Sequence, residues 1–251
     1  MAHALDVDRL HLYLAPDKPL TEAERSRYRG IIKQRHDGIP LQHLIGEVTF
    51  YGLRFKVRRD ALVPRPETEE LLDRLLRLTP RDREIRCLDL GTGSGVLAVC
   101  LARYLPQANV VAVDVSAEAL RLAQENALLN EISDRIRFIE SDWTAHVTGR
   151  FDFVVSNPPY IDHADIAELP VEVRDHEPHT ALDGGRGGTE QIERLLSQVR
   201  NVLVSGGHLF LEIGHGQGDR VRDLMNGVGL TNIRIDNDLA GKERFAVGQC
   251  P

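Results

Sequence analysis

From residue 85 to the C-terminus, short and long apolar segments alternate in a regular order. Short runs rich in β-branched and aromatic residues predict strands, and longer runs with apolar residues three and four apart predict helices. Alternation of this kind is typical of a mostly parallel sheet covered by helices on both faces. We therefore expect an α/β fold with a seven-stranded, doubly wound sheet. Its strands are predicted at 85–90, 108–114, 135–140, 151–156, 207–213, 231–236 and 243–248, and its helices at 94–105, 116–130, 189–203 and 218–228.

The first sixty residues follow other patterns. Thr21 and Glu24 have the spacing of a capping box, which predicts a helix that starts there and stops near Gly38. Residues 47–57 are rich in β-forming residues and predict a hairpin, and Pro66 suits the first turn of a further helix. We therefore expect three parts. They are a small N-terminal helical lobe at 1–45 with room for about two helices, a linking β-hairpin at 46–62, and the main domain at 63–251, within which 79–85 reads as a linker.

The charge balance bears on the partners of the chain. The net charge is −7, and residues 1–60 hold 11 Lys and Arg against 8 Asp and Glu, so the remainder carries −10. Proteins that grip duplex nucleic acid usually present a basic face, because neutralising phosphates supplies much of their affinity. The acidic balance therefore counts mildly against a nucleic-acid substrate.

Targeting signals and cysteines indicate the compartment. The N-terminus carries two aspartates and no apolar core of a signal peptide, and no apolar run has the length of a membrane span. Cys87, Cys100 and Cys250 form no CxxC pair, so we expect them to be reduced, two of them filling the core. These features predict a cytoplasmic protein without a membrane partner.

A glycine-rich turn follows the first strand of the predicted sheet. Glycines at this position allow a tight turn and the close approach of a ligand to a helix N-terminus. Val96 stands where a dinucleotide fingerprint would need glycine, and no lysine follows as in a P-loop, which disfavours a nicotinamide oxidoreductase. The turn fits a nucleoside without a pyrophosphate. Its residues are Gly91, Thr92, Gly93, Ser94 and Gly95.

Two further residues end neighbouring strands. Asp114, at the end of the second strand, has the position of an acid that accepts both ribose hydroxyls of an adenosine. A simpler interpretation makes Asp114 part of the helix cap with Ser116. Trp143, the only tryptophan, follows the third strand, where it either stacks on an adenine ring or packs in the core.

The segment Asn157-Pro158-Pro159-Tyr160 comes directly after the fourth strand. Two prolines rigidify the backbone and remove two N–H donors, which leaves carbonyl oxygens as acceptors. The Asn157 side-chain oxygen and the Pro158 carbonyl would each accept one hydrogen of a planar –NH2 group, and the Tyr160 ring would support its π-system. A proline turn that merely ends the strand is the alternative.

This segment predicts a particular chemistry. An amide nitrogen is a weak nucleophile because its lone pair is delocalised, as the rotation barrier of roughly 18–20 kcal/mol shows. Alignment with an activated methyl group recovers on the order of 7–11 kcal/mol. Acceptors aimed at the N–H groups stabilise the positive charge that develops on nitrogen. A sulfonium methyl donor completes the reaction without a lysine, a cysteine or a strong base.

In these features the chain resembles those class I S-adenosylmethionine-dependent methyltransferases that modify planar amino groups. The class has a Rossmann-like fold. The segments 62–71, 177–188, 211–218 and 238–248 narrow the resemblance to the release-factor glutamine N5-methyltransferases. The resemblance implies that S-adenosyl-L-methionine is the cofactor. It also implies that the substrate is the glutamine of the Gly-Gly-Gln motif in peptide chain release factors.

The resemblance assigns site residues position by position. Residues 91–95, Asp114, Trp143 and Asn157 match the cofactor-contacting positions, and residues 157–160 match the positions that bind the substrate amide, with Asn157, Pro158 and Tyr160 as the catalytic set. The helical lobe at 1–45, shorter than is usual in the family, is expected to dock the substrate. We expect a monomer that uses no metal, since the histidines of the loop at 162–188 match no metal-ligand spacing.

Several alternatives stay open. The same chemistry would serve a glutamine methyltransferase of a ribosomal protein or an adenine-N6 methyltransferase of nucleic acid. The same nucleoside site would also suit a non-catalytic adaptor that binds nucleosides. The sequence leaves open whether Arg65 and Glu67 fold over the cofactor or belong to a capped surface helix. It also leaves open whether the loop at 162–188 is a lid or disordered.

Overall fold

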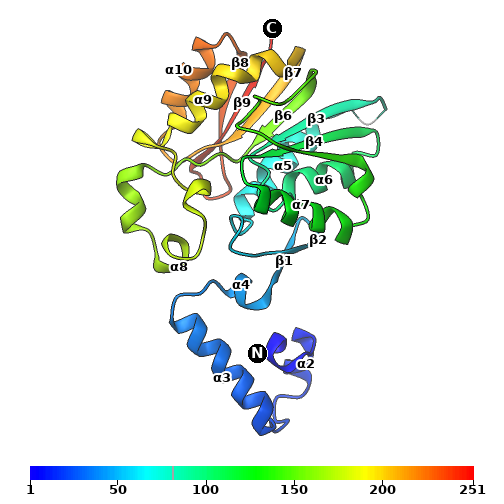
Figure 1. Ribbon diagram of the computed structural model, residues 1–251, viewed down its shortest axis with the longest axis vertical. Helices are drawn as coiled ribbons and strands as arrows, with labels where there is room; N and C mark the ends of the chain where they lie inside the picture. The colour runs from blue at the N-terminus through cyan, green and yellow to red at the C-terminus, as the bar shows by residue number, and fades with distance from the viewer. Residues whose placement is uncertain (81) are drawn as a thin grey trace.

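The computed structural model describes residues 1–80 and 82–251 and places a small helical part beside a large α/β part (Figure 1). The linker expected at 79–85 includes residue 81, which lies outside the described residues. The N-terminal elements are α1 (Ala2–Leu5), α2 (Arg9–Leu14), α3 (Glu22–His36), α4 (Leu41–Ile45), β1 (Glu47–Phe50) and β2 (Leu53–Lys56). The remaining elements are α5 (Pro66–Leu78), β3 (Ile85–Leu90), α6 (Val96–Tyr104), β4 (Ala108–Asp114), α7 (Ala117–Leu129), β5 (Ile136–Glu140), β6 (Phe151–Ser156), α8 (Val171–Arg174), α9 (Glu190–Val199), β7 (Leu203–Glu212), α10 (Gly218–Gly227), β8 (Thr231–Asn237) and β9 (Glu243–Gln249).

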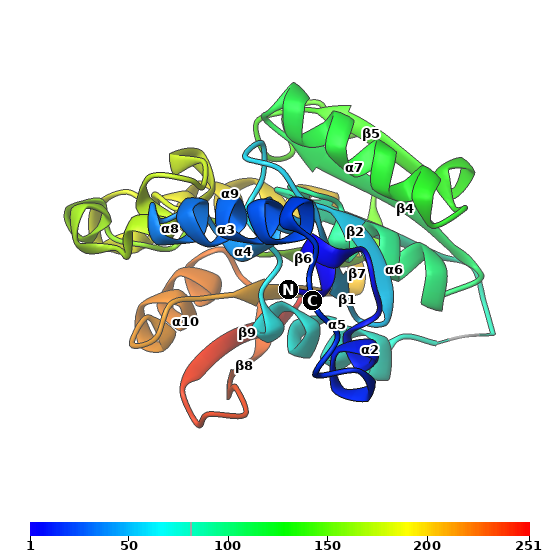
Figure 2. The same ribbon diagram turned by 90° about the horizontal axis from the view of Figure 1, so that it is seen from below.

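The large part is built on a seven-stranded sheet in the order β5-β4-β3-β6-β7-β9-β8. The first five strands in that order are parallel, and β9 is antiparallel to both β7 and β8. Figures 1 and 2 show β5 and β8 at opposite edges of the sheet. The strand order reverses at β3, from which the chain continues first to one side and then to the other, as in doubly wound folds. The predicted fold class is confirmed.

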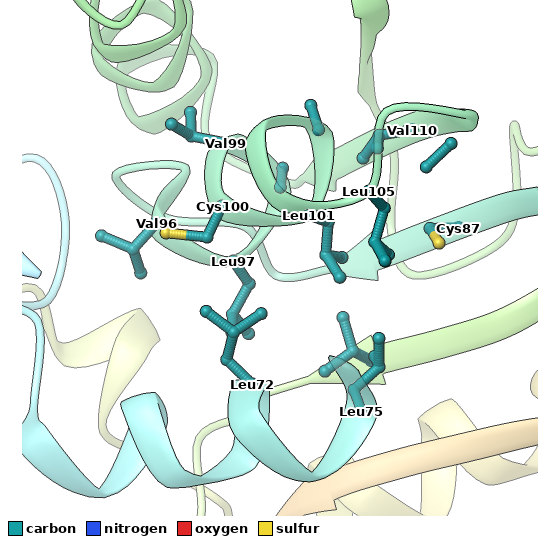
Figure 3. Close-up of a cluster of buried hydrophobic side chains, with 14 of the residues drawn as sticks. Leu72, Leu75, Cys87, Val96, Leu97, Val99, Cys100, Leu101, Leu105 and Val110 are labelled. Carbon is teal, nitrogen blue, oxygen red and sulfur yellow. The ribbon is translucent and has the colours of Figure 1, made fainter. Parts of the chain in front are cut away.

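Each face of the sheet carries its own apolar core. On one face the predicted leucine stripe of α5 packs against α6, and Figure 3 shows Leu72 and Leu75 facing Leu97 and Leu101. On the other face α9 and α10 cover the sheet with side chains such as Ile192. Burial of such large apolar side chains stabilises a fold by roughly 1.5–3 kcal/mol each. All three cysteines are buried and free.

The N-terminal part stands apart from the sheet. The capping box predicted from Thr21 and Glu24 is present at the start of α3, with Thr21 Oγ1 accepting from the Glu24 N–H at 3.2 Å. This part holds four helical segments rather than about two, because Asp8 caps an additional short helix and Pro40 begins another. No side chain of α3 is buried.

The side chain of Asn126 holds the β1–β2 hairpin against α7 through hydrogen bonds. The fully buried Asn126 side chain accepts from the Lys56 N–H at 2.7 Å and donates to the Lys56 carbonyl at 3.1 Å. It also donates to the Ser94 carbonyl at 2.8 Å, so one amide joins the hairpin to the glycine-rich turn.

Among the described residues, no helix combines the length and apolar character needed to cross a bilayer.

Candidate active site

Strand register aligns a glycine and three polar residues at one edge of the sheet. Leu90 pairs with Val113 on one side and with Ser156 on the other, and Ser156 pairs in turn with Leu211. The next positions along these parallel strands therefore form a row across the carboxyl ends. That row is Asp114, Gly91, Asn157 and Glu212.

A cavity of about 540 Å³ opens beside this row. A volume of this size lies within the range of small-molecule and cofactor sites. The predicted residues that line it are Gly91, Thr92, Gly93, Ser94, Asp114, Trp143, Asn157 and Pro159. The cavity thus brings together most of the predicted cofactor residues from the ends of four strands.

The glycine-rich turn uses its three glycines in two ways. All three have positive φ, at 70° for Gly91, 55° for Gly93 and 83° for Gly95, a region that disfavours side chains. Gly91 and Gly93 line the cavity, whereas Gly95 does not. A Cβ at Gly95 would lie 2.9 Å from Cβ of Ala123, so this glycine lets α6 start close against α7.

Asp114 takes part in the start of α7, as the simpler interpretation predicts, and also lines the cavity. One carboxylate oxygen accepts from the Gly93 N–H at 2.8 Å and the other from the Ser116 N–H at 2.9 Å, while Ser116 Oγ caps α7. Each carboxylate oxygen keeps a further acceptor site. Burial raises the pKa of Asp114, and the hydrogen bonds from the Ser116 and Gly93 N–H groups oppose that shift.

Trp143 packs on the glycine-rich turn and lines the cavity. Its side chain is 9% exposed, and its ring carbon Cζ3 would lie 3.7 Å from a Cβ at Gly91. At that distance the two atoms would be in ordinary van der Waals contact, so the positive φ of Gly91, and not the indole ring, is what favours glycine there. Trp143 thus packs against the turn and also lines the cavity, and its stacking on an adenine ring stays a prediction.

Asn157 belongs to a hydrogen-bonded chain that the sequence analysis did not predict. Asn157 Nδ2 donates to Thr68 Oγ1 at 3.1 Å, and Thr68 Oγ1 donates to Glu212 Oε2 at 2.7 Å. The Tyr160 hydroxyl donates to the other oxygen of Glu212 at 3.1 Å. Thr68 is 2% exposed and Glu212 is 1% exposed. The only sign of this hydrogen-bond chain in the sequence is a glutamate near the end of the predicted buried strand at 207–213.

A second cavity, of about 220 Å³, adjoins the first. Tyr160 lines only this smaller cavity, and Asn157 lines both, so the Asn157 side chain lies in the wall that the two cavities share. Pro158 is buried and lines neither cavity. The geometry places a polar amide between a large site and a small one.

The loop at 162–188 is folded over this region. Glu177, which is buried, accepts from the Arg65 guanidinium at 2.6 Å and from the Val63 N–H at 3.4 Å. Burial raises the pKa of Glu177, and Arg65 opposes that shift. Gln217 donates to the Tyr160 carbonyl at 2.9 Å and to the Gly188 carbonyl at 3.2 Å. The loop therefore has specific partners in the site, and Arg65 helps to wall both cavities.

Known families match both parts of the chain. Residues 68–172 match the methyltransferase small domain, and residues 1–46 match the PrmC N-terminal domain. The release factor glutamine methyltransferase of Koribacter versatilis is 40% identical over 99% of this chain and 88% of its own length. That of Synechocystis is 40% identical over 96% of this chain and 84% of its own length.

Solved structures share the fold at low identity. A methyltransferase from Pyrococcus furiosus superposes with a TM-score of 0.62 at 18% identity, covering 86% of this chain and 98% of that one. A 16S rRNA methyltransferase of T. thermophilus in complex with AdoMet and guanosine has a TM-score of 0.58 at 19% identity, over 82% and 50% of the two chains. These likenesses show the methyltransferase fold.

A glycine in a tight turn and a glycine inside a helix should respond in opposite ways to replacement by alanine. We expect Gly95→Ala to lower the free energy of unfolding by about 1–3 kcal/mol, because its φ is unfavourable for alanine and Ala123 blocks the new methyl group. Gly30→Ala, inside α3 with no atom within 4 Å of its new Cβ, is the matched control and should raise that free energy by about 0.5–1 kcal/mol. Urea denaturation measures both, and equal effects would contradict this interpretation.

Proposed function

The chain belongs to the release factor glutamine methyltransferases, and we propose that it transfers a methyl group from S-adenosylmethionine to the side-chain nitrogen N5 of a glutamine. The glutamine is the one in the Gly-Gly-Gln motif of peptide chain release factors. The observation that carries this proposal is the place of Asn157 in the wall between a large and a small cavity. A donor in one cavity and a side-chain amide in the other would meet there.

The residues of the large cavity fit S-adenosylmethionine. Asp114 has free acceptor sites for two ribose hydroxyls, Gly91 and Gly93 allow a close approach to their backbone, and Trp143 offers a ring face. When bound, the cofactor supplies a methyl group made electrophilic by its sulfonium sulfur. The protein would position the cofactor and shield it from water. Residues of the sheet edge and of the loop at 162–188 form much of the cavity wall.

The small cavity fits a glutamine side chain. Its lining combines apolar side chains with two polar ones, namely Leu62, Leu169 and Val173 with Asn157 and Tyr160. Asn157 Oδ1 would accept one hydrogen of the substrate amide. Pro158 lines neither cavity, so the assignment of the second hydrogen to its carbonyl stays a prediction from the sequence. Both acceptors stabilise the positive charge that forms on nitrogen as the new N–C bond forms. The proton is then lost from an alkylated nitrogen that holds it weakly, so no strong base is required.

Protein docking is the proposed task of the N-terminal helical lobe. Several apolar side chains of this lobe face solvent, with Tyr13 71% and Leu14 73% exposed. Exposed apolar groups of this kind are typical of protein-binding surfaces. We propose that the enzyme acts as a monomer on release factors in the cytoplasm, with no nucleic-acid substrate.

Mass spectrometry of a release factor tests the substrate. After incubation with the enzyme and S-adenosylmethionine, we expect a mass gain of one methyl group confined to the Gly-Gly-Gln peptide. Asn157→Ala should abolish the gain, because the substrate amide loses an acceptor, while the exposed Asn201→Ala should retain it. Methylation of a ribosomal protein or of adenine in its place would overturn the proposal.

Fluorescence of Trp143 tests the cofactor site, since it is the only tryptophan. We expect S-adenosylmethionine to change this emission and Asp114→Ala to weaken binding at least about 10-fold, because each hydrogen bond to a charged group contributes about 1.5–3 kcal/mol. Asp134→Ala, an exposed aspartate, is the control. An unchanged affinity in Asp114→Ala would contradict the ribose assignment.

A further inference from the structure

The buried carboxylate of Glu212 stands at the start of a directional hydrogen-bond chain. It ends β7, is 1% exposed, and accepts hydrogen bonds from Thr68 at 2.7 Å and from Tyr160 at 3.1 Å. Buried charges persist in proteins when such partners compensate for lost hydration. Glu212 lines neither cavity, so its effect on the site passes through other residues. Thr68 touches the large cavity alone.

The direction of each hydrogen bond follows from the chemistry of its groups. An ionised carboxylate only accepts, so the Thr68 hydroxyl must use its single hydrogen on Glu212. The Thr68 oxygen then has only lone pairs left for Asn157, which must offer its –NH2 group. The Asn157 oxygen consequently occupies the opposite branch of the amide, away from Thr68.

We propose that Glu212 and Thr68 are positioning residues that hold Asn157 with its side-chain oxygen, and not its nitrogen, toward the substrate amide. The same carboxylate sets the Tyr160 ring through its second oxygen. The inference rests on the proposed function, since it assigns Asn157 an amide as its substrate. A reversed Asn157 would turn –NH2 toward –NH2 and would bring the positive end of its dipole to a nitrogen that is becoming positive.

The protonation of Glu212 controls this direction. Its neighbours that carry charge or titrate are Glu67 on α5, Arg244 on β9 and Tyr160 after β6. Burial raises the pKa of Glu212 to about 7, with Glu67 in the same direction and with Thr68, Tyr160 and Arg244 opposing it. The ionised form therefore declines as pH falls through about 7, and a protonated Glu212 no longer compels Thr68 to donate.

Nuclear magnetic resonance tests the chain without any substrate. In protein labelled with 15N-asparagine, the side-chain –NH2 signals of Asn157 are identified by their loss in Asn157→Ala. We expect these signals to move with pH around a midpoint near 7 and to lose that dependence in Glu212→Gln. Asn157 signals that ignore pH in the wild type, or that respond equally in Glu212→Gln, would overturn the proposal.

Enzyme kinetics test the consequence for methyl transfer. Thr68→Val removes the hydroxyl with little change in shape, and we expect kcat to fall roughly 10²-fold through misorientation of Asn157. KM for the release factor and the cofactor affinity reported by Trp143 should stay near wild type. Thr68→Ser keeps the hydroxyl and should restore most of the rate.

Thr79→Val is the matched control. Thr79 lies at the end of the same helix, is also buried, and donates its hydroxyl to the Leu75 carbonyl at 2.8 Å. The Thr79→Val variant should leave kcat unchanged. A wild-type rate in Thr68→Val, or a loss that follows lost cofactor binding, would overturn the positioning role. If the wild type fails to methylate release factors, the proposed function fails, while the resonance experiment still decides the direction of Asn157.

Discussion

Parallel pairing of β4, β3, β6 and β7 in one register is the constraint on which the site depends. Because Leu90 lies between Val113 and Ser156, and Ser156 lies beside Leu211, the following residues reach the sheet edge together. A shift of one residue in any strand would turn its polar end away from the row. The Ser156 hydroxyl, which donates to the Leu90 carbonyl at 2.6 Å, reinforces the pairing at the edge itself.

The four residues of this row have different surroundings. Asp114 and Gly91 face the large cavity, Asn157 lies between the cavities, and Glu212 is enclosed behind it. The segment at 162–188 closes over this row and touches the N-terminal lobe as well, through an ion pair of 2.5 Å between Arg35 and Glu172. One segment of the chain therefore contacts both the proposed docking lobe and the wall of the substrate cavity.

Most of the fold could be predicted from the sequence, because the strands are short β-rich runs and most of them are separated by longer segments with a helical pattern. The positions of Gly91, Asp114 and Asn157 were also predictable, since each ends a strand whose type is clear. Thr68 and Gln217 could not be predicted, because their partners are fixed by sheet order and by a loop that returns from far along the chain. Gly95 shows a further limit, since its sequence pattern cannot separate a ligand contact from a close helix–helix contact.

The central claim is that the sheet edge presents a glutamine amide to the methyl donor through Asn157. A crystal structure with S-adenosylhomocysteine and a peptide containing Gly-Gly-Gln tests it most directly. We expect the glutamine nitrogen to lie within hydrogen-bonding distance of Asn157 Oδ1, with its free side toward the sulfur. A glutamine bound outside the small cavity, or turned away from the sulfur by an intervening side chain, would contradict it.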